Sequence, residues 1–175
     1  IRDRVESPQN VIFSCMQPQW DAAALDDREQ VLLLDGLQDP GNLGTILRTA
    51  EAFALGAVVL CEGCADPFSP KVVRSTMGAV FRCPVWTVGV EELFALLKKS
   101  GIPLYGAALR EDTLDARAVD YNRCAIAIGS EGRGLTEGVL ALCDRTIKIP
   151  MSEHCESLNA AAAATVLLWE AARND

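Results

Sequence analysis

Three loops in this sequence carry side chains that could do chemistry, and each of them follows an apolar segment. Asn42 and Arg48 stand in "DPGNLGTILRTAEAF", Glu131 in "GSEGRGL", and Ser157 and Asn159 in "PMSEHCESLN". Amides and hydroxyls orient a ligand through hydrogen bonds, a carboxylate accepts them, and a guanidinium binds or stabilises negative charge. Together, such side chains could hold a ligand and stabilise charge that develops on it.

The first loop has a plain interpretation beside the functional one. Asn42 has a side chain that often caps a helix N-terminus, where free N–H groups can bind an anion. Arg48 follows in the middle of the predicted helix, beside Ile46, Leu47 and Ala50. From this loop alone, the favoured interpretation is that Arg48 reaches solvent and that Asn42 only caps the helix.

The second loop contains Gly129, Gly132 and Gly134, but it has neither the G-x-G-x-x-G spacing nor a P-loop lysine. The glycines indicate either a close approach of the backbone to a ligand or a turn with a positive φ. Glu131 is unusual in such a loop because a carboxylate repels phosphate. It favours a cationic or hydroxyl-bearing ligand over a nucleoside triphosphate.

The third loop leads into a predicted helix that contains five consecutive alanines near its start. Ser157 or Asn159 can simply cap this helix, and the small alanines allow another helix to approach closely. His154, the single histidine of the chain, is a candidate general base. A lone histidine on a loop is more often solvated, and that interpretation is favoured.

The pattern of apolar residues predicts the elements that position these loops. Continuous apolar runs indicate buried parallel strands, and apolar residues at helical spacing indicate helices. Strands are predicted at 31–36, 57–61, 83–88, 102–109, 124–129 and 145–150. Helices are predicted at 43–55, ended by Gly56, and at 69–80, 90–101, 136–143 and 158–173. Alternating strands and helices predict an α/β domain with a parallel sheet, which binds ligands at the carboxyl ends of its strands.

Length and composition are those of one globular domain of 175 residues, half of them apolar. Residues 1–30 are predicted to be a linker or N-terminal extension, with a short strand at 10–15 and one short helix. Residues 31–175 are predicted to be the folded domain. No signal peptide or membrane-spanning stretch stands out. The net charge of −8 argues against nonspecific nucleic-acid binding by this domain alone, although a local basic patch or another domain could bind RNA.

Seven cysteines, an odd number, lie mostly in or beside apolar strands, as reduced and buried thiols do. This pattern predicts a reducing, cytoplasmic compartment. Cys61 and Cys64 form a C-x-x-C pair, but no second pair follows, so a metal or redox site there is not favoured.

The three loops, in their order and amino-acid sequence, resemble the three motifs of the SpoU (TrmH-like) family of RNA ribose 2′-O-methyltransferases, within the SPOUT superfamily. "DPGNLGTILRTAEAFALGAVVL" is similar to motif 1, "AIAIGSEGRGL" to motif 2, and "IKIPMSEHCESLNAAAAATVLLWE" to motif 3. The intervening "ADPFSPKVVRSTMGAVFRCPV" also matches the family's wording, so that the resemblance covers residues 31–170.

The resemblance implies a parallel-sheet α/β knot, in which the C-terminal segment threads through a loop to form a deep trefoil knot. Such a knot is an exception to the usual rule for protein chains. The resemblance also implies that S-adenosylmethionine (AdoMet) binds in the knot, that the protein is a homodimer with the site near the interface, and that the substrate is structured RNA, either rRNA or tRNA. No metal and no membrane are expected. Because an upstream RNA-binding domain is common in the family, the resemblance also implies that residues 1–30 are the tail of such a domain, which is absent here.

Carried over by motif, the expected catalytic residues are Asn42, Arg48, Glu131, Ser157 and Asn159. The expected cofactor contacts come from three loops, and they are Gly106, Ala107, Ala108, Gly129, Ser130, Gly132, Ile149, Met151 and Leu158. The family gives the motif 1 arginine a central role, sometimes as the base. Because a guanidinium stays protonated, Arg48 is expected instead to hold the target phosphate and to stabilise a developing alkoxide. Ser157 and Asn159 are expected to face Arg48.

Two alternatives stay open at this point. One is a catalytically silent RNA-binding or assembly protein on the same fold, which is weakened because all five polar motif positions are present. The other is a related knotted enzyme that methylates a base, although the "ESLN" stretch favours ribose.

Overall fold

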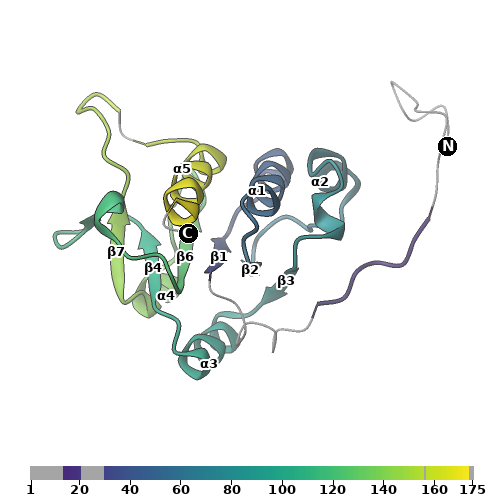
Figure 1. The fold of residues 1–175 in the computed structure, drawn as a ribbon, viewed down its shortest axis with the longest axis horizontal. Helices are drawn as coiled ribbons and strands as arrows, with labels where there is room; N and C mark the ends of the chain where they lie inside the picture. The colour runs from purple at the N-terminus through teal and green to yellow at the C-terminus, as the bar shows by residue number, and fades with distance from the viewer. Residues whose placement is uncertain (1–13, 21–29, 156, 174–175) are drawn as a thin grey trace.

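The computed structural model describes residues 14–20, 30–155 and 157–173 (Figure 1). Within these residues, seven parallel strands form one sheet in the order β3-β2-β1-β6-β4-β7-β5. The strands are β1 (Gln30–Asp35), β2 (Ala57–Cys61), β3 (Val85–Val88), β4 (Leu104–Ala107), β5 (Leu114–Asp115), β6 (Cys124–Gly129) and β7 (Arg145–Lys148). The predicted α/β domain with a parallel sheet is confirmed.

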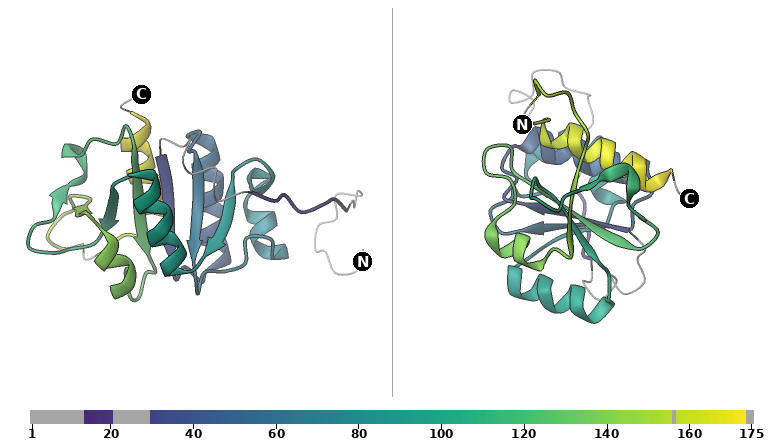
Figure 2. Two further views of the ribbon diagram at one scale, coloured as in Figure 1. Left: turned by 90° about the horizontal axis from the view of Figure 1, so that it is seen from below. Right: turned by 90° about the vertical axis from the view of Figure 1, so that its left-hand side faces the viewer.

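Helices cover both faces of this sheet and make three layers, as the right-hand view of Figure 2 shows. On one face lie α1 (Pro40–Ala52), α2 (Pro70–Ser75) and α5 (Ala160–Ala172), and on the other lie α3 (Val90–Ser100) and α4 (Glu137–Leu142). Two short 3-10 helices, η3 (Ala79–Phe81) and η4 (Ala116–Ala118), complete the described elements. None of the helices in the described ranges is long and apolar enough to cross a membrane.

The central strands are apolar throughout because both of their faces are buried. On β1, Leu32 and Leu34 point into the core beneath α1 and α5, whereas Val31 and Leu33 point into the core beneath α3 and α4. Successive side chains of a strand alternate between faces, so two cores require an unbroken apolar run. The carboxyl ends of the parallel strands meet at one edge of the sheet.

The ends of α1 differ from those predicted. Asp39 caps the helix and its Oδ1 accepts a 2.7 Å hydrogen bond from the Asn42 N–H, so Asn42 lies in the first turn and is not the cap. At the other end, Ala54 takes the left-handed conformation with φ 52°. The N–H groups of Ala54 and Leu55 bond back to the carbonyls of Glu51 and Ala50. This is a Schellman motif completed by alanine, so the prediction that Gly56 ends the helix was wrong.

The predicted helix at 69–80 is two short helices, because Met77 and Gly78 both have positive φ and interrupt it. The sequence also gave no sign of β5 and η4, which are too short for a periodic pattern. The predicted elements before residue 30 are not seen at residues 14–20, and their remaining residues lie outside the described ranges.

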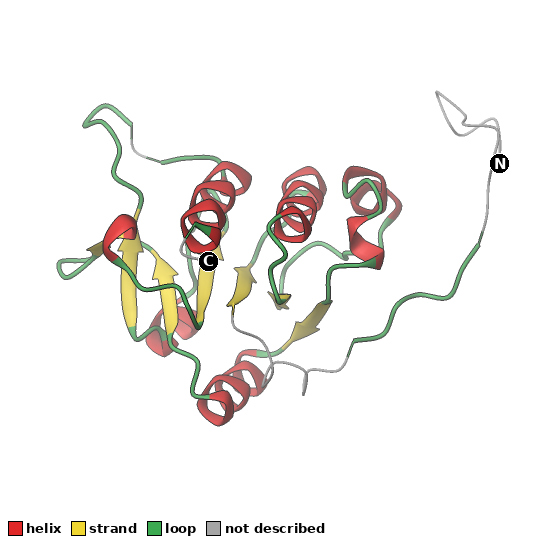
Figure 3. Cartoon of the chain, viewed as in Figure 1, coloured by secondary structure: helices red, strands yellow, loops and turns green. Residues whose placement is uncertain are grey.

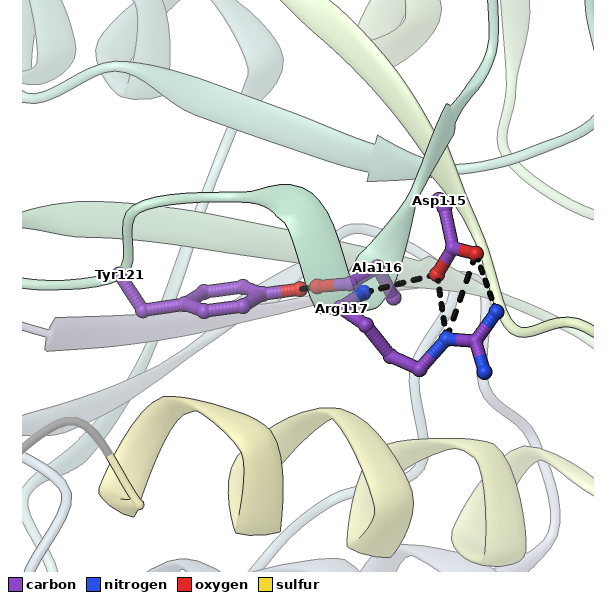
Figure 4. Close-up of polar contacts among 4 residues, drawn as sticks. All are labelled: Asp115, Ala116, Arg117 and Tyr121. Atoms are coloured by element: carbon purple, nitrogen blue, oxygen red, sulfur yellow. Dashed lines mark hydrogen bonds and ion pairs between the residues drawn. The ribbon is translucent and has the colours of Figure 1, made fainter.

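Side chains around η4 fix the segment that returns from β5 to β6 (Figure 4). The Tyr121 side chain is 1% exposed, and its hydroxyl donates a 2.8 Å hydrogen bond to the Ala116 carbonyl. Asp115 accepts hydrogen bonds from the backbone and guanidinium of Arg117, which lower the pKa of this carboxyl to about 2. The segment therefore lies in one defined conformation against α5.

Candidate active site and cofactor pocket

Three of the five expected catalytic side chains form one hydrogen-bonded group. Asn42 Nδ2 donates to Glu131 Oε1, and Asn159 Nδ2 donates to Asn42 Oδ1 at 3.1 Å across 117 positions of sequence. Asn159 Oδ1 also accepts from the N–H groups of Ala161 and Ala162, so Asn159 caps α5 as well. We call Asn42, Glu131 and Asn159 the amide–carboxylate group.

The sheet order explains why these three residues meet. β1 and β6 are neighbours, with Asp35 opposite Gly129 at their carboxyl ends. Asn42 follows β1 in the first turn of α1, and Glu131 follows β6 by two residues. Asn159 arrives from β7 on a long loop that rises past the strand end and turns back to α5 (Figure 3). All three loops therefore end at the same edge of the sheet.

A cavity of about 210 Å³ opens beside this group. Ile128 on β6, Ile147 on β7 and Leu167 on α5 form part of an apolar wall, while Glu131 and Ser157 add polar groups. The cavity is thus bounded by the three strands β4, β6 and β7, by the glycine loop and by the helix capped by Asn159. A ligand in it would touch apolar carbon on one side and a carboxylate on the other.

Most of the residues expected to contact a cofactor lie in the wall of this cavity. They are Ala107, Gly129, Ser130, Ile149, Met151 and Leu158. Gly106, Ala108 and Gly132 are not among the lining residues. Gly106 lies behind the wall, where a Cβ atom would come within 2.7 Å of Cys143 Sγ. That glycine is therefore needed for close packing between β4 and the residue after α4.

The sequence interpretation missed the part of the wall that α5 provides. Ala160, Ala163 and Leu167 line the cavity, and their spacing of three and then four residues places them on one face of the helix. Leu109, Gly134 and Lys148 were missed as well. The helical spacing was a signal present in the sequence, but it indicates only a buried face and does not say whether protein or ligand covers it.

Gly129 is the tightest point of the glycine loop. A Cβ atom there would lie 2.0 Å from the carbonyl carbon of Gly134, because the loop folds back on itself. Ser130 and Gly134 exchange backbone hydrogen bonds of 3.2 and 2.8 Å, which close this turn. Gly134 has φ 67°, whereas Gly132 has no other atom within 4 Å of its Cβ position. The three glycines therefore have different structural roles.

Arg48 is not brought to the amide–carboxylate group within one chain. It follows Asn42 by six residues, which on an α-helix is about 9 Å along the axis and roughly 120° around it. The Arg48 side chain is exposed, and it has no hydrogen bond or ion pair with another described residue. The expected approach of Ser157 and Asn159 to Arg48 is therefore not seen; Asn159 contacts Asn42 instead.

Ser157 and His154 lie on the loop between β7 and α5. Ser157 lines the cavity and is exposed, and its carbonyl accepts a hydrogen bond from Cys155 Sγ at 3.5 Å. His154 is exposed and is not among the lining residues. The position of the imidazole thus agrees with the solvated interpretation of this residue.

The Cys61–Cys64 pair is packed into the fold as neutral thiols. Cys64 Sγ accepts from the Leu37 N–H and donates to the Leu34 carbonyl, both at 3.3 Å. Burial raises the pKa of the Cys61 thiol to about 12, and the charge of Asp35 adds to this rise. Burial also raises the pKa of Cys64. Across the described ranges, no three His, Cys, Asp or Glu side chains are grouped so that they could hold a metal ion.

Thiol labelling of the native protein should therefore be selective. At pH 8, a disulfide reagent such as DTNB is expected to react rapidly with the exposed Cys15 and Cys155 and slowly with the other five cysteines. Thiolate is the reacting form, and a raised pKa keeps a thiol protonated at this pH. In urea all seven cysteines should react. Rapid native labelling of Cys61 or Cys64, located by peptide mass spectrometry, would contradict the structural role of this pair.

Comparison with known proteins places the fold and the loops in one family. Residues 29–169 match the SpoU rRNA Methylase family. The chain is 37% identical over 164 residues to the 23S rRNA (guanosine(2553)-2'-O)-methyltransferase RlmP of Bacillus subtilis, covering 94% of this chain and 65% of that protein. It is 39% identical over 171 residues to an uncharacterized tRNA/rRNA methyltransferase of Synechocystis, covering 95% of this chain and 61% of that protein.

Solved structures show the same relationship. A putative RNA methyltransferase of the TrmH family from Porphyromonas gingivalis matches with a TM-score of 0.77 and 40% identity, over 85% of this chain and 61% of that one. An AdoMet-bound rRNA methyltransferase from Sinorhizobium meliloti matches with a TM-score of 0.80 and 33% identity, over 86% and 60%.

The chain spans between 60% and 65% of the length of these four proteins. The match to the family covers most of the sequence, and it includes all three loops that meet at the cavity. This chain therefore belongs to the SpoU rRNA Methylase family.

Proposed function

We propose that this chain forms the catalytic domain of an AdoMet-dependent methyltransferase that modifies a ribose 2′-hydroxyl of structured RNA, either rRNA or tRNA. The observation that carries the proposal is that Glu131 belongs both to the cavity wall and to the amide–carboxylate group. A cofactor in the cavity would therefore lie beside the polar side chains. The relatives support this function, since RlmP is named as a 2′-O-methyltransferase and the Sinorhizobium structure is described as AdoMet-bound.

The cavity wall fits AdoMet chemically. Adenine has two apolar faces, and Ile149, Leu158 and Leu167 offer an apolar surface to them. The sulfonium carries a positive charge and the ribose carries hydroxyls, and the Glu131 carboxylate is a favourable neighbour for either. Gly129 and Ser130 also lie in the wall, and Ser130 carries a hydroxyl that can form hydrogen bonds. These residues, with Ala107 and Met151, are the proposed cofactor contacts.

The reaction needs alignment more than it needs a strong catalyst. Bound AdoMet supplies a methyl group on a good leaving group, so the protein must align the ribose hydroxyl and stabilise charge as its proton leaves. The amide–carboxylate group holds the glycine loop, α1 and α5 in fixed relation, and Ser157 offers a hydroxyl at the cavity. Arg48 is proposed to bind the target phosphate and to stabilise the developing alkoxide, because its guanidinium stays charged.

We further propose that Arg48 acts in the site of a second copy of the chain, in a homodimer. Arg48 points outward from the layer formed by α1, α2 and α5, and this layer also carries exposed apolar side chains. Trp169 and Val166 on α5 are 57% and 38% exposed, and Met77, beyond α2, is 72% exposed. The Trp169 ring lies 5.8 Å from that of Phe53 at the end of α1, so α1 and α5 share one surface. Apolar surface of this kind favours association.

A trefoil knot is the proposed path of the C-terminal segment. β7 lies between β4 and β5, and the chain that returns from β5 to β6 passes through η4, which packs against α5. Residues after β7 must pass this returning segment to reach α5. This arrangement supports threading through the loop between β4 and β6.

The free cysteines of the described ranges support a reducing, cytoplasmic location.

Titration calorimetry with AdoMet, followed by methyl transfer from labelled AdoMet to total RNA with the full-length protein, tests the proposed function. We expect one AdoMet site per chain and label in RNA, located on a ribose by nuclease mapping. A folded protein that binds no AdoMet would favour the silent RNA-binding alternative. Label on a base would favour the base methyltransferase. Either result would overturn the proposal.

A further inference from the structure

Asp35 is a buried carboxylate at the end of β1 that no motif of the sequence singles out. Asp35 is only 2% exposed, and it lies opposite Gly129 in the β1–β6 register. Asp35 Oδ2 accepts a hydrogen bond of 2.6 Å from the backbone N–H of Thr136. Thr136 is the first residue after the glycine loop, and its hydroxyl caps α4. Asp35 therefore holds the residue that follows the glycine loop, and this loop forms one wall of the cavity.

The glycine loop is held at both ends, and Asp35 provides one of the two polar anchors. At the near end, Glu131 is bonded to Asn42 on α1. At the far end, Leu135 is buried with its Cδ1 3.0 Å from the Cβ position of Gly106, and Thr136 is bonded to Asp35. Between these ends, the Gly134 backbone packs closely against Gly129 and forms hydrogen bonds with Ser130. The loop thus has little freedom as long as both anchors are intact.

A carboxylate is a costly choice for a purely structural contact at this depth. Burying a charge is unfavourable unless strong hydrogen bonds compensate, and a charge-assisted bond to a backbone N–H is stronger and shorter than a neutral one. The opposite end of β1 uses a neutral group for a similar task. There, Gln30 is 8% exposed and its Nε2 donates to the Tyr121 and Ala171 carbonyls at 3.2 and 3.3 Å. The two ends of one strand therefore provide a matched pair.

We propose that Asp35 is a positioning residue of the cofactor pocket: through the Thr136 N–H, it fixes the glycine loop in the shape that binds AdoMet. It touches neither the cofactor nor the RNA. The role rests on the proposed function of the chain as an AdoMet-dependent enzyme. Its structural part, the anchoring of the loop, can be tested without any ligand.

The test compares Asp35→Ala and Asp35→Asn with the control Gln30→Ala in the intact protein. In the ligand-free state, hydrogen exchange of the peptide covering 130–136 should be at least tenfold faster in Asp35→Ala and unchanged in Gln30→Ala. The Kd for AdoMet, from calorimetry, should rise at least tenfold in Asp35→Ala and by less in Asp35→Asn, whose amide oxygen can still accept the Thr136 N–H. Gln30→Ala should lower the melting temperature and leave the Kd unchanged.

Each outcome decides the role of Asp35. Wild-type exchange and a wild-type Kd in Asp35→Ala would overturn the proposal, and so would equal effects of the Asp35 and Gln30 substitutions on the Kd. If Asp35→Ala does not fold, Asp35→Asn provides the same comparison with a smaller expected change. If the wild-type protein binds no AdoMet, the proposed function fails, while the exchange experiment still decides whether Asp35 anchors the loop.

Discussion

Arg48→Ala is expected to abolish methyl transfer, by at least a thousandfold, while leaving the affinity for AdoMet within about twofold of wild type. The physical reason is that Arg48 lies outside the cavity wall and away from the amide–carboxylate group, on the outward side of α1. It can therefore act on RNA without contacting the cofactor. Methyl transfer from labelled AdoMet and calorimetry measure the two effects separately.

Complementation shows whether Arg48 serves its own chain or a partner. We expect inactive Arg48→Ala and inactive Glu131→Ala chains, co-expressed with different tags, to recover about a quarter of wild-type activity. Half of the randomly formed dimers are mixed, and in each mixed dimer one site has both an intact pocket and an intact arginine. Mixed dimers purified through both tags should have about half of wild-type activity. No recovery in purified mixed dimers would show that Arg48 acts within its own chain.

Arg48→Lys separates charge from geometry. A lysine keeps the positive charge but loses the planar fork that binds phosphate through two parallel hydrogen bonds. Most of the activity should be lost in this variant. Wild-type turnover would show that charge alone is sufficient and would exclude the bidentate role.

Gly129→Ala is expected to have the second large effect, a loss of AdoMet affinity of at least a hundredfold with a destabilisation of about 2–3 kcal/mol. The added methyl group would meet the backbone of Gly134 at 2.0 and 2.1 Å, and backbone cannot swing aside as a flexible side chain can. The loop would have to leave its position beside the cavity. Calorimetry with AdoMet and urea unfolding measure the two changes.

Gly132→Ala is the matched control, since it adds the same methyl group three residues later in the same loop. No atom lies within 4 Å of that Cβ position, and Gly132 does not have a positive φ. The change in stability should stay within about 0.5 kcal/mol, and AdoMet should bind as in wild type. Equal losses in the two variants would mean that the loop tolerates no side chain at all and that the contact with Gly134 is not the cause.

The sequence predicted the sheet well because its strands are buried on both faces. A strand that is packed between two cores needs apolar residues at successive positions, as in "VLLLD". This pattern can be recognised without knowing the rest of the fold. The glycine loop and the polar residues after β1 and β6 could be predicted to lie together for a second reason. Parallel strands bring their carboxyl ends to the same edge of the sheet. The ends of the helices were harder to predict from the sequence. Asp39 and Asn42 are both residues that often cap a helix, and only the three-dimensional position of α1 decides between them.

Two features of the site were within reach of the sequence but were overlooked. The six-residue spacing from Asn42 to Arg48 already places these side chains on different sides of a helix. Asp35 was visible as a carboxylate at the end of an otherwise apolar strand, which is where a buried anchor would stand. By contrast, Gly78 was the only local signal for the break at Met77 and Gly78, because a positive φ is usual for glycine but not for methionine.

The pocket wall that α5 provides makes ligand recognition depend on a segment that is synthesised after every strand of the described sheet. The last helix supplies Ala160, Ala163 and Leu167 to the cavity, the cap Asn159 to the amide–carboxylate group, and the Ala171 carbonyl to Gln30 at the start of β1. A nascent chain on the ribosome can build the central strands early, but the wall of its cavity is incomplete until Leu167 of α5 has emerged. Products truncated before α5 lack this part of the wall, so a ligand in the cavity selectively stabilises molecules that contain the helix.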